Sequence, residues 1–349
     1  MIATDPDEYI NSNPNSIKLG CSEIFENIAA EAYLNFAAFT PPSSLTRKVM
    51  ENWYEDYSCN GAAAYINWVN QRDRLRDKLA KLINCNSKNI GFGDSTSGLI
   101  SDITLMLDWK SGDRVLVFDG DFPSVIYPVK NAAKLFDLDV VMHKLDGFCD
   151  CSGNGLQRIE EELKSGVRLV ALSSTQYHTG LLMPVREISI LCKKYGAQLL
   201  VDGAQSCGAL NVDVREEGVD FLMAPTHKWL MGIEGAAFIY ISERAMDQLV
   251  FRRTGWMSYE GGLEFLFGEP GKLSYDNEVR KKPSFLEFGM SNSIGFAALE
   301  VGVSAHLHIG MKATRVYIQS LHDRLEDGLL SLGYKSVRQK DKNSRSSIL

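Results

Sequence analysis

The sequence predicts an α/β fold with a doubly wound, mainly parallel sheet. Apolar runs at residues 114–118, 169–173, 199–201 and 221–223 have the length and composition of buried strands. Helical stretches separate most of these runs, and strand–helix–strand units of this length form right-handed crossovers between parallel strands. Because the alternation continues from residue 90 to 241, we expect one large α/β domain there.

The elements of this domain have local signals of their own. The expected strands are short apolar or β-branched runs that end in polar or glycine-containing turns. The helix expected at residues 184–195 begins at Pro184 and ends before Gly196, which is the usual asymmetry of helix ends. Further strands are expected at residues 90–93, 140–143 and 236–241, and further helices at residues 99–107, 125–134 and 155–164.

The first part of the chain is predicted to be partly helical. Residues up to about Ser22 are expected to form a mobile arm, and residues 23–32 a short helix. In residues 63–83 apolar side chains recur at helical spacing, while a run of charges from Arg72 to Asp77 covers the opposite face. The simplest interpretation of this charged run is a solvated face.

The composition favours a soluble globular enzyme. The 349 residues are 45% hydrophobic and 23% charged, with a formal net charge of −7, so no broad basic face for nucleic acid is expected. No apolar run reaches the length of a membrane span, and residues 1–16 lack the basic and apolar regions of a secretory signal. Seven cysteines, an odd number, indicate reduced thiols. We expect a cytoplasmic protein with no nucleic-acid or membrane partner.

The only close pair of cysteines is Cys149 and Cys151. The pair lacks the spacing of metal ligands and has no second pair to complete a site. We therefore predict no metal site.

The leading candidate site residues are Asp202 and Lys228. Asp202 ends one apolar run, and the next run leads to Lys228. Open α/β sheets bind ligands at the carboxyl ends of their strands, so the two side chains are expected to face one crevice. That pair suits pyridoxal phosphate, because a lysine binds the aldehyde of this cofactor and a carboxylate keeps its pyridine nitrogen protonated. Taken singly, a turn-capping aspartate and a surface lysine explain them equally well.

Neighbouring residues make the interpretation specific. The segment Asp202-Gly203-Ala204-Gln205, followed by His227-Lys228-Trp229, resembles the class V aminotransferase family of fold-type-I pyridoxal-phosphate enzymes. That group includes cysteine desulfurases and isopenicillin N epimerase. The resemblance extends from about Tyr33 to Asn292. It implies pyridoxal phosphate as the cofactor.

The resemblance also implies the domain organisation. A large cofactor-binding domain is expected over residues 33–292, after an N-terminal arm and helix over residues 1–32. Helical runs at residues 294–306 and 316–330 open a small C-terminal α/β domain over residues 293–349. Relatives continue further in this domain, so we expect a shortened C-terminus.

A small polar turn is the candidate phosphate site. Ser95, Thr96 and Ser97 follow an expected strand and begin an expected helix, where free N–H groups and the helix dipole favour a phosphate. The same three residues are also ordinary N-cap candidates. The resemblance identifies the turn as the family's phosphate cup. It adds His227 to the phosphate ligands, with Thr226 as a substitute for the hydroxyl that relatives carry where Pro225 stands.

The resemblance assigns further side chains to the cofactor ring and the substrate. Phe122 stacks on the ring, unless it is simply a core residue, and Gln176 and Gln205 bind the phenolic oxygen. The remaining candidates are Ala37 and Ala38, which line the substrate side, and His178, which either touches substrate or is structural. Phe36 and Phe39 are bulkier than the family pattern and are expected to narrow this pocket.

The resemblance implies a homodimer, because the segment around Met290 reaches the partner's phosphate in relatives. Met290 replaces the threonine that relatives use, and Ser291 is the only neighbouring hydroxyl. 

The expected activity is Cα-proton abstraction from a small amino acid by Lys228, which the cofactor aldehyde first captures, while Asp202 keeps the ring nitrogen charged. Burial and a cationic His227 would lower the pKa of Lys228 and favour its free base. Transamination, epimerisation and C–S lysis remain open outcomes. The alternatives are a cysteine desulfurase whose persulfide segment is missing, since no cysteine follows Cys207, and an inactive family scaffold that acts as a binding partner.

Overall fold

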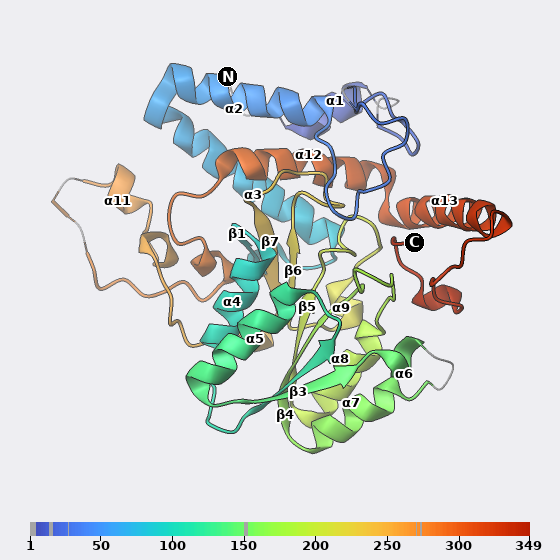
Figure 1. Cartoon of the computed structure of the whole chain (residues 1–349). Helices are drawn as coiled ribbons and strands as arrows, with labels where there is room; N and C mark the ends of the chain where they lie inside the picture. Colours follow the sequence, from blue (N-terminus) through green and yellow to red (C-terminus); the bar gives the residue numbers. More distant parts are fainter. Residues whose placement is uncertain (1–4, 14–16, 27, 150–152, 270, 273) are drawn as a thin grey trace.

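A seven-stranded sheet forms the centre of the computed structural model, which describes residues 5–13, 17–26, 28–149, 153–269, 271–272 and 274–349 (Figure 1). The strand order is β1-β7-β6-β5-β4-β2-β3, and the five strands from β6 to β3 are parallel neighbours. The strands are β1 (Ile90–Gly93), β2 (Arg114–Asp119), β3 (Asp139–Lys144), β4 (Val167–Ser173), β5 (Gln198–Asp202), β6 (Phe221–Pro225) and β7 (Ala237–Ile241). The doubly wound, mainly parallel sheet is thus confirmed.

Strand β7 is the exception, since it runs antiparallel to both β6 and β1. A parallel connection needs a crossover of a dozen or more residues, usually a helix. The link from Pro225 to Ala237 contains no helix. The chain therefore returns beside β6, and this return carries Lys228.

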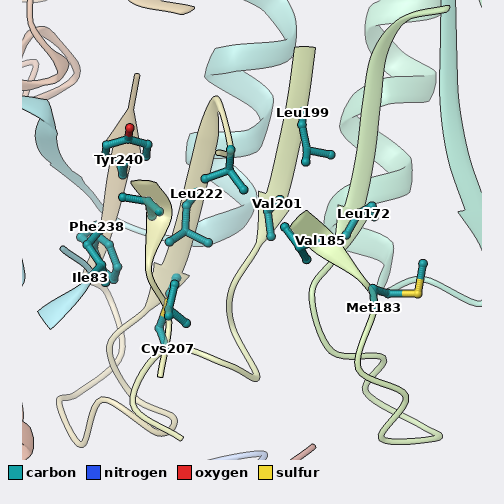
Figure 2. Close-up of a cluster of buried hydrophobic side chains, with 14 of the residues drawn as sticks. Ile83, Leu172, Met183, Val185, Leu199, Val201, Cys207, Leu222, Phe238 and Tyr240 are labelled. Atoms are coloured by element: carbon teal, nitrogen blue, oxygen red, sulfur yellow. The ribbon is translucent and has the colours of Figure 1, made fainter. Parts of the chain in front are cut away.

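Helices cover both faces of the sheet (Figure 1). One face packs on α4 and α5, and the other on α3, α7, α8 and α12. Figure 2 shows part of the second core, where Leu172, Val201 and Leu222 from three strands meet. The helices are α1 (Pro6–Ser12), α2 (Ser44–Asn60), α3 (Tyr65–Leu82), α4 (Thr96–Met106), α5 (Pro123–Phe136), α6 (Asp146–Cys149), α7 (Gly155–Lys164), α8 (Val185–Tyr195), α9 (Val214–Glu217), α10 (Glu243–Met246), α11 (Glu264–Phe267), α12 (Ser293–Ile309) and α13 (Met311–Ser331).

The prediction of a helix at residues 23–32 was wrong. The described residues of this segment form turns and bends, and none of them is fully buried. An isolated helix of this length is only marginally stable unless it packs an apolar face, so helix-forming residues alone do not make this segment helical. The helix instead begins after Pro41 and Pro42, where the Ser43 hydroxyl accepts a hydrogen bond from the Thr46 N–H and caps α2.

The arm that precedes this segment is docked rather than mobile in its described part. Helix α1 begins at an Asp5 cap, and Ile10 and Ile17 are buried against α2, α3 and α12. Residues 1–4 and 14–16 of the predicted arm lie outside the described residues.

The charged run on α3 was also interpreted wrongly, because Arg72 is 3% exposed and Arg74 is bound by a residue of α12. Glu300 of α12 is 1% exposed and accepts a two-pronged bond from Arg74 at 2.7 and 3.0 Å. Lys78 lies 3.0 Å from the same carboxylate and 2.5 Å from Asp5. These residues form an ion cluster, defined here as Asp5, Arg74, Lys78 and Glu300, that joins α1, α3 and α12.

Helix α12 is apolar because it is core. No single helix in the described part of the chain is long and apolar enough to cross a membrane, and α12 passes such a test only together with α13, across an 87° bend. Most of the α12 residues are buried against α2, α3 and the sheet.

We predict that Glu300→Gln lowers the free energy of unfolding by about 3 kcal/mol, because it leaves the buried Lys78 and the half-buried Arg74 short of a counter-charge. Chemical denaturation measures the change. The matched control is Glu243→Gln, which removes a carboxylate that is 72% exposed and paired with Lys88; no measurable change is expected there, because solvent screens the pair. Equal stability of the Glu300 variant and the wild type would contradict a stabilising role for the cluster.

Candidate active site

Asp202 and Lys228 line one cavity of about 290 Å³ at the carboxyl ends of β5 and β6. Asp202 is the last residue of β5, and Lys228 follows β6 by three residues. The side chain of Phe122, at the N-terminal cap of α5, lines the same cavity, with its ring centroid 5.4 Å from the Lys228 Nζ. The two residues that the sequence analysis paired are therefore brought together, and a third candidate lies beside them.

Asp202 is buried and hydrogen-bonded where it lines the cavity. Its side chain is 3% exposed, and Oδ1 accepts a hydrogen bond of 2.8 Å from the Ala204 N–H. Burial raises the pKa of this carboxyl, against the weaker lowering by the Ala204 N–H and by the charge of Lys228. The carboxylate therefore lacks a full counter-charge, and a protonated ring nitrogen would supply one.

Burial also sets the protonation of the amine. It lowers the pKa of Lys228, and the charge of Asp202 opposes this only in part. A larger share of this lysine is thus in the free-base form that attacks an aldehyde or takes a proton.

His227 was expected to lower the pKa of Lys228 if its imidazole were charged, and this condition is not met at pH 7. Burial lowers the pKa of His227 itself, the Lys228 charge lowers it further, and Glu234 only partly opposes them. The imidazole is therefore mostly neutral at pH 7. His227 still lines the cavity, where it can donate or accept a hydrogen bond.

One end of the cavity suits a phosphate. Ser95 caps α4 through a 3.1 Å hydrogen bond from the Gly98 N–H, and the Ser97 hydroxyl lies 2.6 Å from that of Ser124. The Thr96 Oγ1 is buried with no hydrogen-bond partner among the described residues. A buried hydroxyl is normally satisfied, so this atom is available for a ligand oxygen.

Ser124 is a cavity residue that the sequence analysis missed. It lies in the first turn of α5, so the N-termini of two helices, α4 and α5, meet at this end of the cavity. The signal was present in the sequence, because Pro123 marks a helix start directly after Phe122. Two other missed residues, Asp94 and Glu234, are acidic and also line the cavity.

The two candidate glutamines are placed differently. Gln205 donates to the Ala37 carbonyl at 2.9 Å and accepts from the Trp229 indole at 2.7 Å, which leaves its second amide N–H for a ligand. Gln176 is 0% exposed, and its amide donates to the buried carboxylate of Asp121 at 3.0 Å. The structure thus brings Gln205 to a small adjoining cavity beside Lys228, but not Gln176.

Thr226 is fully buried and its hydroxyl donates to the carbonyl of Ile233, so it faces the protein rather than the cavity. This placement does not support Thr226 as a phosphate ligand.

The candidate substrate residues Ala37, Ala38 and His178 do not line the cavity. The expectation that Phe36 and Phe39 narrow it is likewise not met. Phe36 stacks on Trp229 with ring centroids 6.4 Å apart, and Phe39 packs on His227 at 5.5 Å. Both rings support the chain that carries Lys228.

A second cavity of about 340 Å³ adjoins the first, since Asp94 and Gly235 line both. Met290 and Ser291 line it, as does Arg253. The segment for which we expected a role across a dimer thus lies next to the phosphate end.

The described residues contain no group of three or more His, Cys, Asp or Glu side chains arranged to hold a metal ion. Asp150 and Cys151, next to the Cys149 considered above, lie outside that part of the structure.

The residues present fit pyridoxal phosphate. The cavity is close to the lower end of the range of about 300–1,000 Å³ for small-molecule sites. It combines a half-buried amine, a buried carboxylate that lacks a full counter-charge, an aromatic face and an unsatisfied hydroxyl at a helix N-terminus. Fold and site together define a fold-type-I pyridoxal-phosphate enzyme.

The chain belongs to the aminotransferase class-V family, whose sequence pattern matches residues 32–349. It is 28% identical over 305 residues to a probable cysteine desulfurase of Methanothermobacter thermautotrophicus, covering 86% of this chain and 72% of that one. It is 29% identical over 252 residues to a kynureninase of Deinococcus radiodurans, covering 67% of this chain and 59% of that one. Pyridoxal phosphate is the cofactor of this family, and the chain is an enzyme of the class.

Among solved structures, the chain resembles the cystine C–S lyase C-DES in complex with its reaction product, cysteine persulfide. The TM-score is 0.74 at 25% identity, over 82% of this chain and 74% of that one.

We predict that Asp202→Asn lowers the pKa of Lys228 further, because it removes the carboxylate that partly opposes the effect of burial. An amine reacts as the free base, so reductive methylation of Lys228 in cofactor-free protein should begin at lower pH. Mass spectrometry of the labelled peptide follows the reaction. The exposed Lys88 in the same samples is the control and should not change. An unchanged pH profile at Lys228 would mean that the carboxylate does not act on the amine.

Proposed function

We propose that this protein is a C–S lyase that eliminates the sulfur substituent of a small sulfur-containing amino acid. The observation that carries the proposal is the shared cavity of Asp202 and Lys228, with hydroxyls at its far end. When bound, pyridoxal phosphate supplies an electron sink for the charge that develops at the substrate Cα. The roles that follow are those of the chain's own residues.

The Lys228 Nζ takes the Cα proton. Its burial favours the free base that this step requires. Asp202, fixed by the Ala204 N–H, holds the proton on the ring nitrogen. Phe122 covers one face of the ring and excludes water, and the α4 turn with Ser95, Thr96 and Ser97 binds the phosphate.

The proposed reaction balances with one water. The Cα proton moves to Nζ, the Cβ–S bond breaks, and its electron pair leaves with sulfur, which ends as hydrogen sulfide from cysteine, a persulfide from cystine or a thiol from another S-substituted cysteine. Water then releases the nitrogen as ammonia and the carbon skeleton as pyruvate. No group outside the cavity is needed.

Two observations support lysis over desulfuration by an enzyme cysteine. The described lining of the cavity contains no cysteine, and the nearby Cys207 is 2% exposed, with burial raising its thiol pKa. The name of the similar C-DES structure, a cystine C–S lyase, points the same way. Transamination and epimerisation share the first proton transfer, so they remain alternatives that product analysis separates.

We predict that the protein loaded with pyridoxal phosphate converts L-cysteine or L-cystine to pyruvate and ammonia in equal amounts. Lys228→Ala should lower kcat by about a thousandfold, because it removes the base. Lys88→Ala, on an exposed lysine, is the matched control and should leave kcat unchanged.

The products decide between the alternatives. Alanine in place of pyruvate would indicate desulfuration, a keto acid that retains sulfur would indicate transamination, and loss of optical rotation alone would indicate epimerisation. A bound cofactor whose absorbance no amino acid changes would favour the inactive scaffold. Each of these results would contradict lysis.

We also propose that the protein is a homodimer. The basis is the resemblance of residues 286–292 to a segment that crosses between subunits in relatives, together with the position of Met290 and Ser291 beside the cofactor cavity. Sedimentation of the cofactor-loaded protein should give twice the mass of the 38.9 kDa chain. A fully loaded monomer would contradict the proposal.

A further inference from the structure

The backbone around Lys228 is held by groups from two distant parts of the chain. Thr40 donates its backbone N–H to the His227 carbonyl at 2.8 Å and its hydroxyl to the Lys228 carbonyl at 2.7 Å. The ring of His306, on α12, is bonded through Nε2 to the Trp229 carbonyl at 2.7 Å. Three consecutive carbonyls are thus bound from outside their own turn.

Both donors are buried. Thr40 is 0% exposed and His306 is 5% exposed. Burial lowers the pKa of His306, so the imidazole is neutral and its Nε2 carries the proton that the carbonyl accepts. Water does not compete for these bonds, which makes each of them a fixed constraint on the turn.

The turn that carries Lys228 has little freedom to adopt another conformation. Met231 adopts a left-handed conformation with φ +57°, which is uncommon for a residue with a side chain. At Gly302 of α12, a Cβ atom would lie 1.9 Å from the Leu230 carbonyl oxygen, so helix and turn are in direct contact. A shift of the turn would therefore break several contacts at once.

We infer that Thr40 and His306 are positioning residues that fix the Lys228 amine at the distance and angle needed to capture the cofactor aldehyde and to reach the substrate Cα. Neither side chain lines the cavity, so both act through the backbone of residues 227–229. A displacement of about 1 Å at a reacting group can cost about a hundredfold in rate, which gives such a constraint its value. The inference rests on the proposed function only in that Lys228 is the reactive amine.

The first test separates binding of the cofactor from capture by the lysine. Pyridoxal phosphate reports both events, whereas 4′-deoxypyridoxine phosphate lacks the aldehyde and reports binding alone. Thr40→Val keeps the shape and the backbone N–H but removes the hydroxyl. We expect it to slow capture of pyridoxal phosphate by apoprotein about tenfold, followed by visible absorbance, while the affinity for 4′-deoxypyridoxine phosphate stays within about twofold.

Conservative variants and a matched control complete the design. Thr40→Ser retains the hydroxyl and should restore capture to within about twofold of the wild type. His306→Gln keeps an N–H donor and should do the same, whereas His306→Leu should behave like Thr40→Val. The control is Thr314→Val, which removes a buried hydroxyl that donates to the Gly310 carbonyl at the N-terminal cap of α13, and this variant should capture at the wild-type rate.

The outcomes are distinct. Equal capture rates in Thr40→Val and Thr314→Val would overturn the role of the Thr40 hydroxyl. If capture, melting temperature and affinity for 4′-deoxypyridoxine phosphate all fell together, the hydroxyl would only stabilise the fold, and the positioning role would be overturned as well. If Thr40→Val fails to fold, the comparison of His306→Gln with His306→Leu decides by the same criteria. If the wild-type protein captures pyridoxal phosphate and the variants behave as expected, but no amino acid is converted, the proposed function is contradicted and this inference is unaffected.

Discussion

A half-buried amine and a buried carboxylate meet at the carboxyl edge of the sheet, and the chemistry of the site depends on that pair. Burial raises the pKa of Asp202 and lowers that of Lys228, so each group resists the charge that it would carry in water. Side-by-side strands β5 and β6 bring the two chain segments to one place. The sheet thus creates a site where a charged heterocycle and an aldehyde both find partners.

The phosphate end of the site relies on dipoles and hydroxyls. Helices α4 and α5 both begin there, and serine and threonine hydroxyls are the side chains available. His227 is mostly neutral, and the acidic Asp94 and Glu234 line the same cavity. Binding of a phosphate must therefore depend on backbone N–H groups and hydroxyl donors, which is the usual chemistry of a helix N-terminus.

Helix α12 connects the outer layer of the fold to the site. Glu300 on this helix accepts bonds from α3 and closes the ion cluster that docks the N-terminal residues. His306, further along the same helix, binds the carbonyl next to Lys228, and Gly302 between them allows the close approach of the turn. The packing that stabilises the fold and the contacts that place the amine therefore share one element.

The sequence by itself determined the sheet, most of its covering helices and the pairing of Asp202 with Lys228. These follow from local patterns, because apolar runs, helix ends and strand-end residues carry their signals within a few positions. Predictions from the sequence were wrong where distant segments of the chain bind the same polar or charged side chains. Residues 23–32 form turns and bends instead of a helix, the half-buried Arg74 is bound by Glu300 of α12, and the amide of Gln176 is bound by Asp121. Only the tertiary structure decided these contacts and the hydrogen bonds of Thr40 and His306 to the turn that carries Lys228. The reason is that the burial and the partners of a polar group depend on distant chain segments, which no local pattern records.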